Sequence, residues 1–166
     1  MEMQRITEND VLIGTALWLH ENNWRIKQIS MASGQNIDLV AHKQKVVTRF
    51  TQAGLKVDEI MFRSNGPDIE ATKGSHIIKI ECKGLGNVRI QTVKNNFDRA
   101  VASAVSYYDV KKEPNLQIAL ALPEYYLKLM KNKLSQSLRE AISLWIFLYA
   151  AIDEVLVFMP TETLPD

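Results

Sequence analysis

Residues 116–122 place the strongest limit on the fold, because this stretch is apolar at every position except Gln117. A strand with one wet face alternates between apolar and polar residues, whereas a strand that is apolar throughout is covered on both faces. Patterns of helical and extended spacing surround the stretch on both sides in the chain. We therefore expect an α/β protein of mixed α+β character, in which a central mixed β-sheet is flanked by helices.

Four segments have apolar residues at helical spacing. Thr7 is expected to cap the first helix, which is apolar over most of its circumference and should be buried. Asn36 is expected to cap the second, and Gly54 to end it. The expected helices cover residues 7–20, 36–53, 92–108 and 123–141, and the expected strands cover 24–31, 57–63, 68–72, 77–83, 116–122, 144–149 and 155–159. Residues 160–166 are expected to be loose.

A two-stranded ribbon is predicted over residues 68–83, with a turn at Lys73-Gly74. Its second strand alternates cleanly. Ile78, Ile80 and Cys82 point to one side, and the charged residues between and after them point to the other. Cys82 is therefore expected to be a buried, unreactive thiol.

The pairing in this ribbon decides which charged groups meet. A two-residue loop at 73–74 would place Asp68 opposite Lys79 and make Glu81 its diagonal neighbour, roughly 7–8 Å away. Asp68, Glu81 and Lys83 then share one face, so two carboxylates can converge on a hard cation within reach of a lysine. A slip of one residue would separate them.

The order Pro67-Asp68, then Glu81-Cys82-Lys83 on the next strand, resembles the PD-(D/E)xK nuclease superfamily. The resemblance covers residues 37–122 and implies a restriction-endonuclease-like αβββαβ core. It also implies hydrolysis of DNA phosphodiesters with Mg²⁺ or Mn²⁺. A metal held by carboxylates can activate water and neutralise charge, and Mg²⁺ needs few protein ligands.

The resemblance implies a role for each matching residue. Asp68 and Glu81 would hold the metal, joined by the backbone carbonyl of Cys82. Lys83 would orient the attacking water or stabilise charge on the phosphate. Asp68, Glu81 and Lys83 are thus the expected catalytic residues of an endonuclease-like enzyme.

The helix after the ribbon both matches and departs from the family. Several branches carry a glutamine four residues before a tyrosine; here the tyrosine is Tyr107, but Ser103 stands at the glutamine position. Arg99, Ser103 and Lys79 are the candidate contacts to nucleic acid. The family often adds an acid from an upstream helix, and the sequence leaves that position open among Glu8, Asp10, Glu21 and Asp38.

Length and composition are those of one domain over 1–166, with an N-terminal helical extension (1–35), a core (37–122) and a C-terminal helix and β-hairpin (123–159). The net charge of +1 excludes binding to nucleic acid through a global positive field, so a DNA surface must be local. One cysteine excludes an internal disulfide framework, and the longest apolar run is too short for a membrane span. A cytoplasmic protein without membrane contact is expected.

Two other functions stay open. The chain could be a catalytically inactive nuclease-fold module that binds DNA or protein, because of the missing glutamine. It could also be one subunit of a homodimer or of a larger DNA-processing complex, with the surface around Trp145 and Phe147 as the contact.

Overall fold

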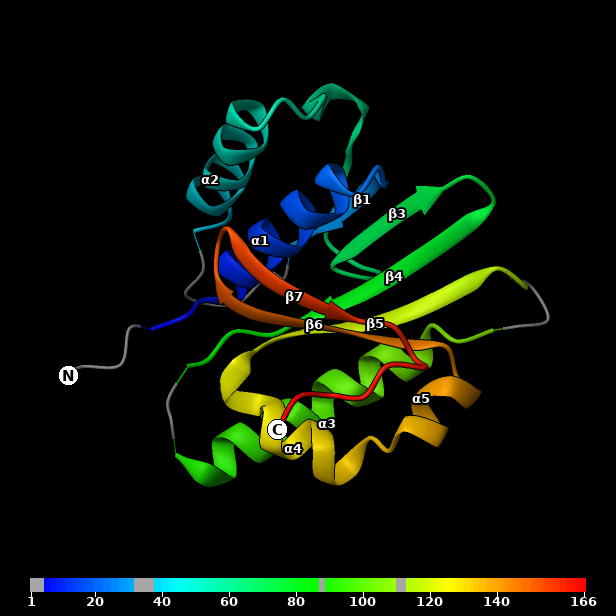
Figure 1. The fold of residues 1–166 in the computed structure, drawn as a ribbon. Helices are drawn as coiled ribbons and strands as arrows, with labels where there is room; N and C mark the ends of the chain where they lie inside the picture. Colours follow the sequence, from blue (N-terminus) through cyan, green and yellow to red (C-terminus); the bar gives the residue numbers. More distant parts are fainter. Residues whose placement is uncertain (1–4, 32–37, 87–88, 110–112) are drawn as a thin grey trace.

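The computed structural model describes residues 5–31, 38–86, 89–109 and 113–166, which form a mixed α/β fold (Figure 1). A seven-stranded sheet runs through these residues in the order β2-β1-β3-β4-β5-β6-β7. Helices α1 and α2 lie on one side of the sheet, and α3, α4 and α5 on the other. The helices are α1 (Glu8–Glu21), α2 (Leu39–Gln52), α3 (Ile90–Ser106), α4 (Leu127–Lys133) and α5 (Gln136–Ala141). The strands are β1 (Arg25–Ser30), β2 (Met61–Arg63), β3 (Ile69–Lys73), β4 (His76–Cys82), β5 (Leu116–Pro123), β6 (Leu144–Ala151) and β7 (Glu154–Phe158). The expected central mixed sheet flanked by helices is confirmed.

The sheet is antiparallel between β1, β3 and β4, and parallel from β4 through β5 to β6. Strand β2 adds to β1 in parallel, and β7 returns antiparallel to β6. Strand β4 therefore lies in the middle of the sheet and joins an antiparallel half to a parallel half. The N-terminal segment supplies β1, which lies between β2 and β3.

Two apolar cores, one on each face, explain the apolar run on β5. Ala119 and Ala121 belong to the core beneath α1, whereas Ile118 and Leu120 belong to the core beneath α3. Each of these side chains is fully buried. Successive residues of a strand point to opposite faces, so a strand covered on both sides is apolar at every position.

The start of α1 agrees with the sequence. The Thr7 hydroxyl accepts from the backbone N–H of Asp10, and the Asp10 carboxylate accepts from the N–H of Thr7, which completes a capping box. The expected cap of the second helix was wrong: Asn36 lies outside the described residues, and the cap is Asp38, whose carboxylate accepts from the N–H of Ala41. Gly54, at φ +82°, ends α2 as expected.

Two of the expected elements are divided in the structure. The strand expected over 57–63 is shorter, because Val57–Glu59 forms a 3₁₀ turn and only Met61–Arg63 pairs with β1. The single helix expected over 123–141 is broken into a 3₁₀ turn (Glu124–Tyr126), α4 and α5. The break falls at Ser135, whose hydroxyl caps α5 by accepting from the N–H of Leu138.

Residues 160–166 are bound to the rest of the fold, contrary to the expectation that they would be loose. Arg139 on α5 is 1% exposed and donates to the backbone carbonyls of Met159 and Glu162. Leu164 is buried in the core on the α3 side. Phe147, expected at a contact surface, is fully buried under α1. None of the helices in the described part of the chain has the length and apolarity needed to cross a bilayer.

Candidate functional site

The ribbon forms, but its turn lies one residue later than expected. Gly74 and Ser75 make the turn, with Gly74 at φ +59°, a conformation that glycine adopts at no steric cost. Lys73 therefore pairs with His76, and Glu70 pairs with Lys79. The last pair of the ladder is Ile69 with Ile80, and one further step places Asp68 opposite Glu81 instead of Lys79. The register moves by two residues, which preserves the side of the sheet on which each residue lies.

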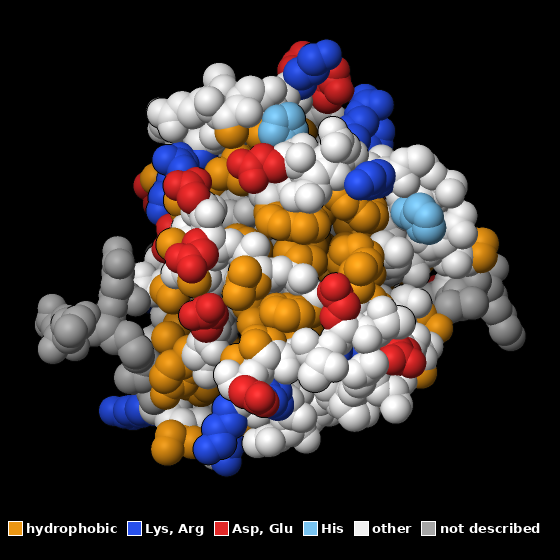
Figure 2. Space-filling view, viewed as in Figure 1, with side chains coloured by type: hydrophobic (Ala, Val, Ile, Leu, Met, Phe, Trp, Pro, Cys, Tyr) orange, Lys and Arg blue, Asp and Glu red, His pale blue; other side chains and the backbone are white. Residues whose placement is uncertain are grey.

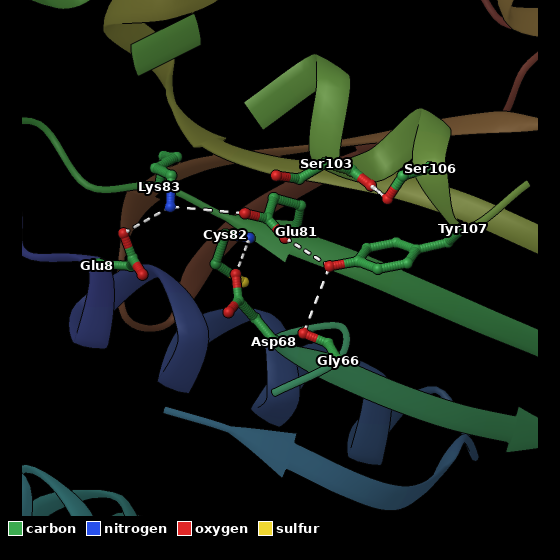
Figure 3. Close-up of polar contacts among 9 residues, drawn as sticks. All are labelled: Glu8, Gly66, Asp68, Glu81, Cys82, Lys83, Ser103, Ser106 and Tyr107. Atoms are coloured by element: carbon green, nitrogen blue, oxygen red, sulfur yellow. Dashed lines mark hydrogen bonds and ion pairs between the residues drawn. The ribbon is translucent and has the colours of Figure 1, made fainter. Parts of the chain in front are cut away.

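Asp68 lies just before β3, where β3 and β4 stop pairing. Its Oδ2 accepts from the backbone N–H of Cys82 at 2.7 Å, which satisfies an N–H that has lost its strand partner (Figure 3). The backbone carbonyl of Asp68 accepts from the N–H of Ser30 on β1 at 2.9 Å. Asp68 is thus held by both neighbouring strands, through its carboxylate on the β4 side and its backbone carbonyl on the β1 side, and the residue is 9% exposed.

The loop before Asp68 is fixed by polar side chains of β1. Ser30 Oγ donates to the carbonyl of Asn65 at 2.6 Å, and Gln28 Nε2 donates to Ser30 Oγ at 3.0 Å. Gly66 has φ +93°, and a Cβ there would lie 2.9 Å from Gln28 Nε2. Glycine is therefore favoured at this position by its backbone conformation, and a Cβ would in addition displace the end of the Gln28 side chain.

Lys83 lies between two carboxylates from different layers of the protein. Its Nζ is 3.5 Å from Glu81 Oε1 and 3.1 Å from Glu8 Oε2 on the first turn of α1. Figure 3 shows Glu8 reaching Lys83 from the helix below β4. The structure thus singles out Glu8 among the four candidate upstream acids.

The approach of α1 to the end of β4 depends on Gly84. A Cβ at this position would overlap the backbone N of Glu8 and lie 2.5 Å from the carbonyl carbon of Thr7. Leu85 N–H donates to the carbonyl of Ile6 at 2.7 Å, forming an isolated antiparallel bridge. No spacing in the sequence signals this crossing, which is why the sequence could not choose Glu8.

The other three acids have different surroundings. Asp10 belongs to the capping box and forms an ion pair with Lys45 at 2.8 Å. Asp38 caps α2, and Glu21 lies at the opposite end of α1 from Glu8.

Tyr107 closes the site from the α3 side. Its hydroxyl donates to Glu81 Oε2 at 3.1 Å and lies 3.4 Å from the carbonyl oxygen of Gly66. Ser103, one turn earlier on α3, lies on the same side of the helix in Figure 3. Its backbone carbonyl accepts from Ser106 Oγ at 2.6 Å. Because its hydroxyl donates to Glu81 Oε2, Tyr107 orients the Glu81 carboxylate.

Burial and, after it, the nearby charge of Glu81 raise the pKa of Asp68 to about 8, against the lowering effect of the Cys82 N–H. Burial also raises the pKa of Glu81, although Lys83 and Tyr107 oppose this. Burial alone would lower the pKa of Lys83, but the carboxylates of Glu8, Glu81 and Asp68 raise it overall. Lys83 is therefore a cation at neutral pH, and it lies near Asp68 and Glu81, two acids whose ionisation is made costly by burial. Burial likewise raises the pKa of Cys82, consistent with an unreactive thiol.

The carboxylate oxygens of Asp68 and Glu81 are the type of ligand that a hard divalent cation prefers. Within the described ranges, no three His, Cys, Asp or Glu side chains are close enough together to form a metal-binding group. Mg²⁺ commonly takes only one or two carboxylates and keeps several waters. Asp68 and Glu81 supply two, and an added positive charge would offset the cost of ionising both.

The expected nucleic-acid contacts differ in their surroundings. Lys79 is paired with Glu113 at 2.7 Å and its side chain is 18% exposed, so its charge is largely neutralised. Arg99 is exposed and, among the described residues, makes no ion pair. Ser103 is half-buried beside the site.

Comparison with protein-family models, curated proteins and solved structures finds no match to the chain.

Proposed function

We propose that this protein is a metal-dependent nuclease that hydrolyses DNA phosphodiesters, with Asp68 and Glu81 as ligands of Mg²⁺ or Mn²⁺. The observation that supports this is the convergence of Asp68, Glu81, Lys83 and Glu8 at one end of the central strand. The resemblance to the PD-(D/E)xK superfamily, with its restriction-endonuclease-like fold, carries the substrate class. A bound divalent ion would neutralise phosphate charge and lower the pKa of a coordinated water.

The chain's own residues have separable roles in this proposal. The N–H of Cys82 fixes the Asp68 carboxylate, and the Tyr107 hydroxyl fixes one oxygen of Glu81, so both ligands are oriented before a metal binds. The backbone carbonyl of Cys82, at the end of β4, remains the expected third ligand. Lys83 carries the positive charge that would face the scissile phosphate or hold the attacking water. Glu8 aligns Lys83 and is available as a further acid.

The test is cleavage of plasmid and oligonucleotide DNA with Mg²⁺ or Mn²⁺. Glu81→Gln and Lys83→Ala should each lower the rate about 100-fold or more, because each removes a group that stabilises charge in the transition state. Glu124→Gln and Lys128→Ala are matched controls at exposed positions and should retain the full rate. Equal cleavage by all five proteins would show that the activity belongs to a contaminant and would refute the assignment.

A second candidate is a nuclease-fold module that binds DNA or a partner protein without turnover. Two observations favour it: Ser103 stands where several branches carry glutamine, and Lys83 is held by two carboxylates. Calorimetry with Mn²⁺ separates the two functions. A nuclease should bind the ion and lose that binding in Glu81→Gln, whereas a binding module should show salt-dependent DNA binding without metal uptake or cleavage.

A further inference from the structure

A pocket of about 400 Å³ lies on the α1 side of the sheet, near the turn of the β3–β4 ribbon and far along the strands from Asp68. Three tryptophans line it: Trp18 on α1, Trp24 just before β1, and Trp145 on β6. Figure 2 shows apolar side chains gathered in the middle of this face of the molecule. The volume is within the range of small-molecule pockets, roughly 300–1,000 Å³.

The tryptophans are held in fixed orientations. Trp24 and Trp145 pack edge to face, with ring centroids 6.3 Å apart at 85°. Trp18 packs edge to face on the buried Phe147 at 5.3 Å. Trp24 is 7% exposed, whereas Trp18 and Trp145 are half-buried and retain ring surface toward solvent. The pocket therefore offers pre-ordered aromatic surface to a flat ligand.

Gln117, the one polar residue in the apolar run of β5, lines the same pocket. Its Oε1 is buried and has no hydrogen-bond partner. Its carboxamide makes no hydrogen bond elsewhere in the described part of the chain, and its Oε1 has to turn toward the pocket before it can reach a ligand. Buried polar atoms are normally hydrogen-bonded, so an unpaired amide beside an aromatic pocket is a candidate hydrogen-bonding group for a ligand.

The charges at the pocket are unequally distributed. Lys73 and His76 lie at the ribbon turn, and the Lys73 ammonium donates to the carbonyl of Asn22 at 2.9 Å. Glu162 lies on the C-terminal segment, where its carboxylate accepts from the N–H of Met159. The Lys73 ammonium next to the rings disfavours a cationic ligand and suits an anionic group attached to a flat ring.

We propose that this pocket binds an adenine ring, carried either by an unpaired nucleotide of a nucleic-acid strand or by a free adenine nucleotide. The tryptophan faces supply stacking, which is sequence-tolerant. Once its Oε1 has turned toward the pocket, the Gln117 carboxamide supplies selectivity, because a glutamine amide pairs in a bidentate manner with the adjacent donor and acceptor of adenine. Lys73 and His76 are placed for the phosphate. This inference does not depend on the nuclease activity.

Tryptophan fluorescence titrations in EDTA test the proposal without cleavage. The ligands are AMP, a single-stranded oligo-dA, an oligo-dT of equal length, and the dA strand with its bases removed. The dA strand or AMP should quench the fluorescence and bind at least about fivefold tighter than oligo-dT or the abasic strand. Binding of the dA strand alone identifies a strand as the source, and comparable binding of AMP identifies a free nucleotide.

The variant Gln117→Leu should abolish the preference for adenine while keeping the unfolding temperature close to that of the wild type. Gln52→Leu, at an exposed position on α2, is the matched control and should retain the preference. Equal affinity for dA, dT and abasic strands would overturn the proposal, as would an unchanged adenine preference in Gln117→Leu.

Discussion

Replacing Asp68 with asparagine should stabilise the protein at neutral pH in the absence of divalent metal. In the unfolded chain this carboxyl ionises near pH 3.8, whereas burial and the neighbouring Glu81 keep it protonated in the folded state up to about pH 8. Between these two values the folded state binds more protons than the unfolded state. The free energy of unfolding therefore falls as the pH rises through this window.

The size of the effect follows from the width of the window. One unit of pKa difference corresponds to about 1.4 kcal/mol, so protonating Asp68 in order to fold at pH 7 costs about 4 kcal/mol. Asparagine resembles the protonated acid and keeps an oxygen for the Cys82 N–H. Coupling to Glu81 reduces the gain, so we expect Asp68→Asn to be about 2–4 kcal/mol more stable than the wild type at pH 7. The two proteins should be nearly equal at pH 4.

Urea unfolding between pH 4 and pH 8, in EDTA, measures this difference directly. Asp58→Asn is the matched control, because Asp58 is exposed on the 3₁₀ turn, and its difference from the wild type should not change with pH. A parallel pH dependence for the wild type and Asp68→Asn would show that the carboxyl is not protonated in the folded state and would refute the reasoning.

Adding Mg²⁺ at pH 8 should stabilise the wild type more than Asp68→Asn, and so reduce the stability advantage of the variant. Ligand binding to the folded state stabilises it by about 2.7 kcal/mol at a concentration 100 times the Kd. The wild type should gain this stability, and Asp68→Asn should gain little, because it lacks one of the two proposed carboxylate ligands. An equal gain in both would place the metal elsewhere.

Three further changes test the supports around the site. Gly84→Ala should lower the free energy of unfolding by about 1–3 kcal/mol, because its Cβ meets the backbone of the α1 cap, whereas Gly86→Ala, which meets nothing, should be neutral in urea unfolding. Tyr107→Phe should cost about 1 kcal/mol through the lost hydrogen bond to the buried glutamate and raise the pKa of that glutamate, measurable by NMR titration; Tyr108→Phe should leave that pKa unchanged. Arg139→Met should release the C-terminal segment, so that limited proteolysis cuts it faster than in the wild type.

The sequence predicted the sheet best where a strand is buried. Two patterns predict which faces of a strand are buried: the alternation of Ile78, Ile80 and Cys82, and the apolar run on β5. The structure confirms both. The turn was misplaced because Lys73-Gly74 and Gly74-Ser75 are both acceptable turn pairs. Only strand pairing decides between them. The side of Asp68 was nevertheless correct, because moving the turn by one residue changes the pairing by two.

Local signals failed where two of them compete. The apolar spacing around Ser135 predicts one continuous helix, but serine also favours the start of a new helix. In the structure Ser135 caps α5, and the helix is interrupted there. Glu8 was one of four equivalent acids because its position beside Lys83 depends on a contact between residues 75 positions apart in the chain. Arg139 appeared to be an ordinary surface arginine, and its role in holding the C-terminal segment depends on carbonyl groups some 20 residues further along.

The central position of β4 has a mechanical consequence. Asp68 belongs to the antiparallel half of the sheet, whereas Glu81 and Lys83 belong to the strand that begins the parallel half. The spacing of these groups is therefore set by the pairing of β3 with β4, which the hydrophobic core on the α1 side also spans. A substitution that shifts β3 against β4 would therefore change the spacing of Asp68 from both Glu81 and Lys83 at once.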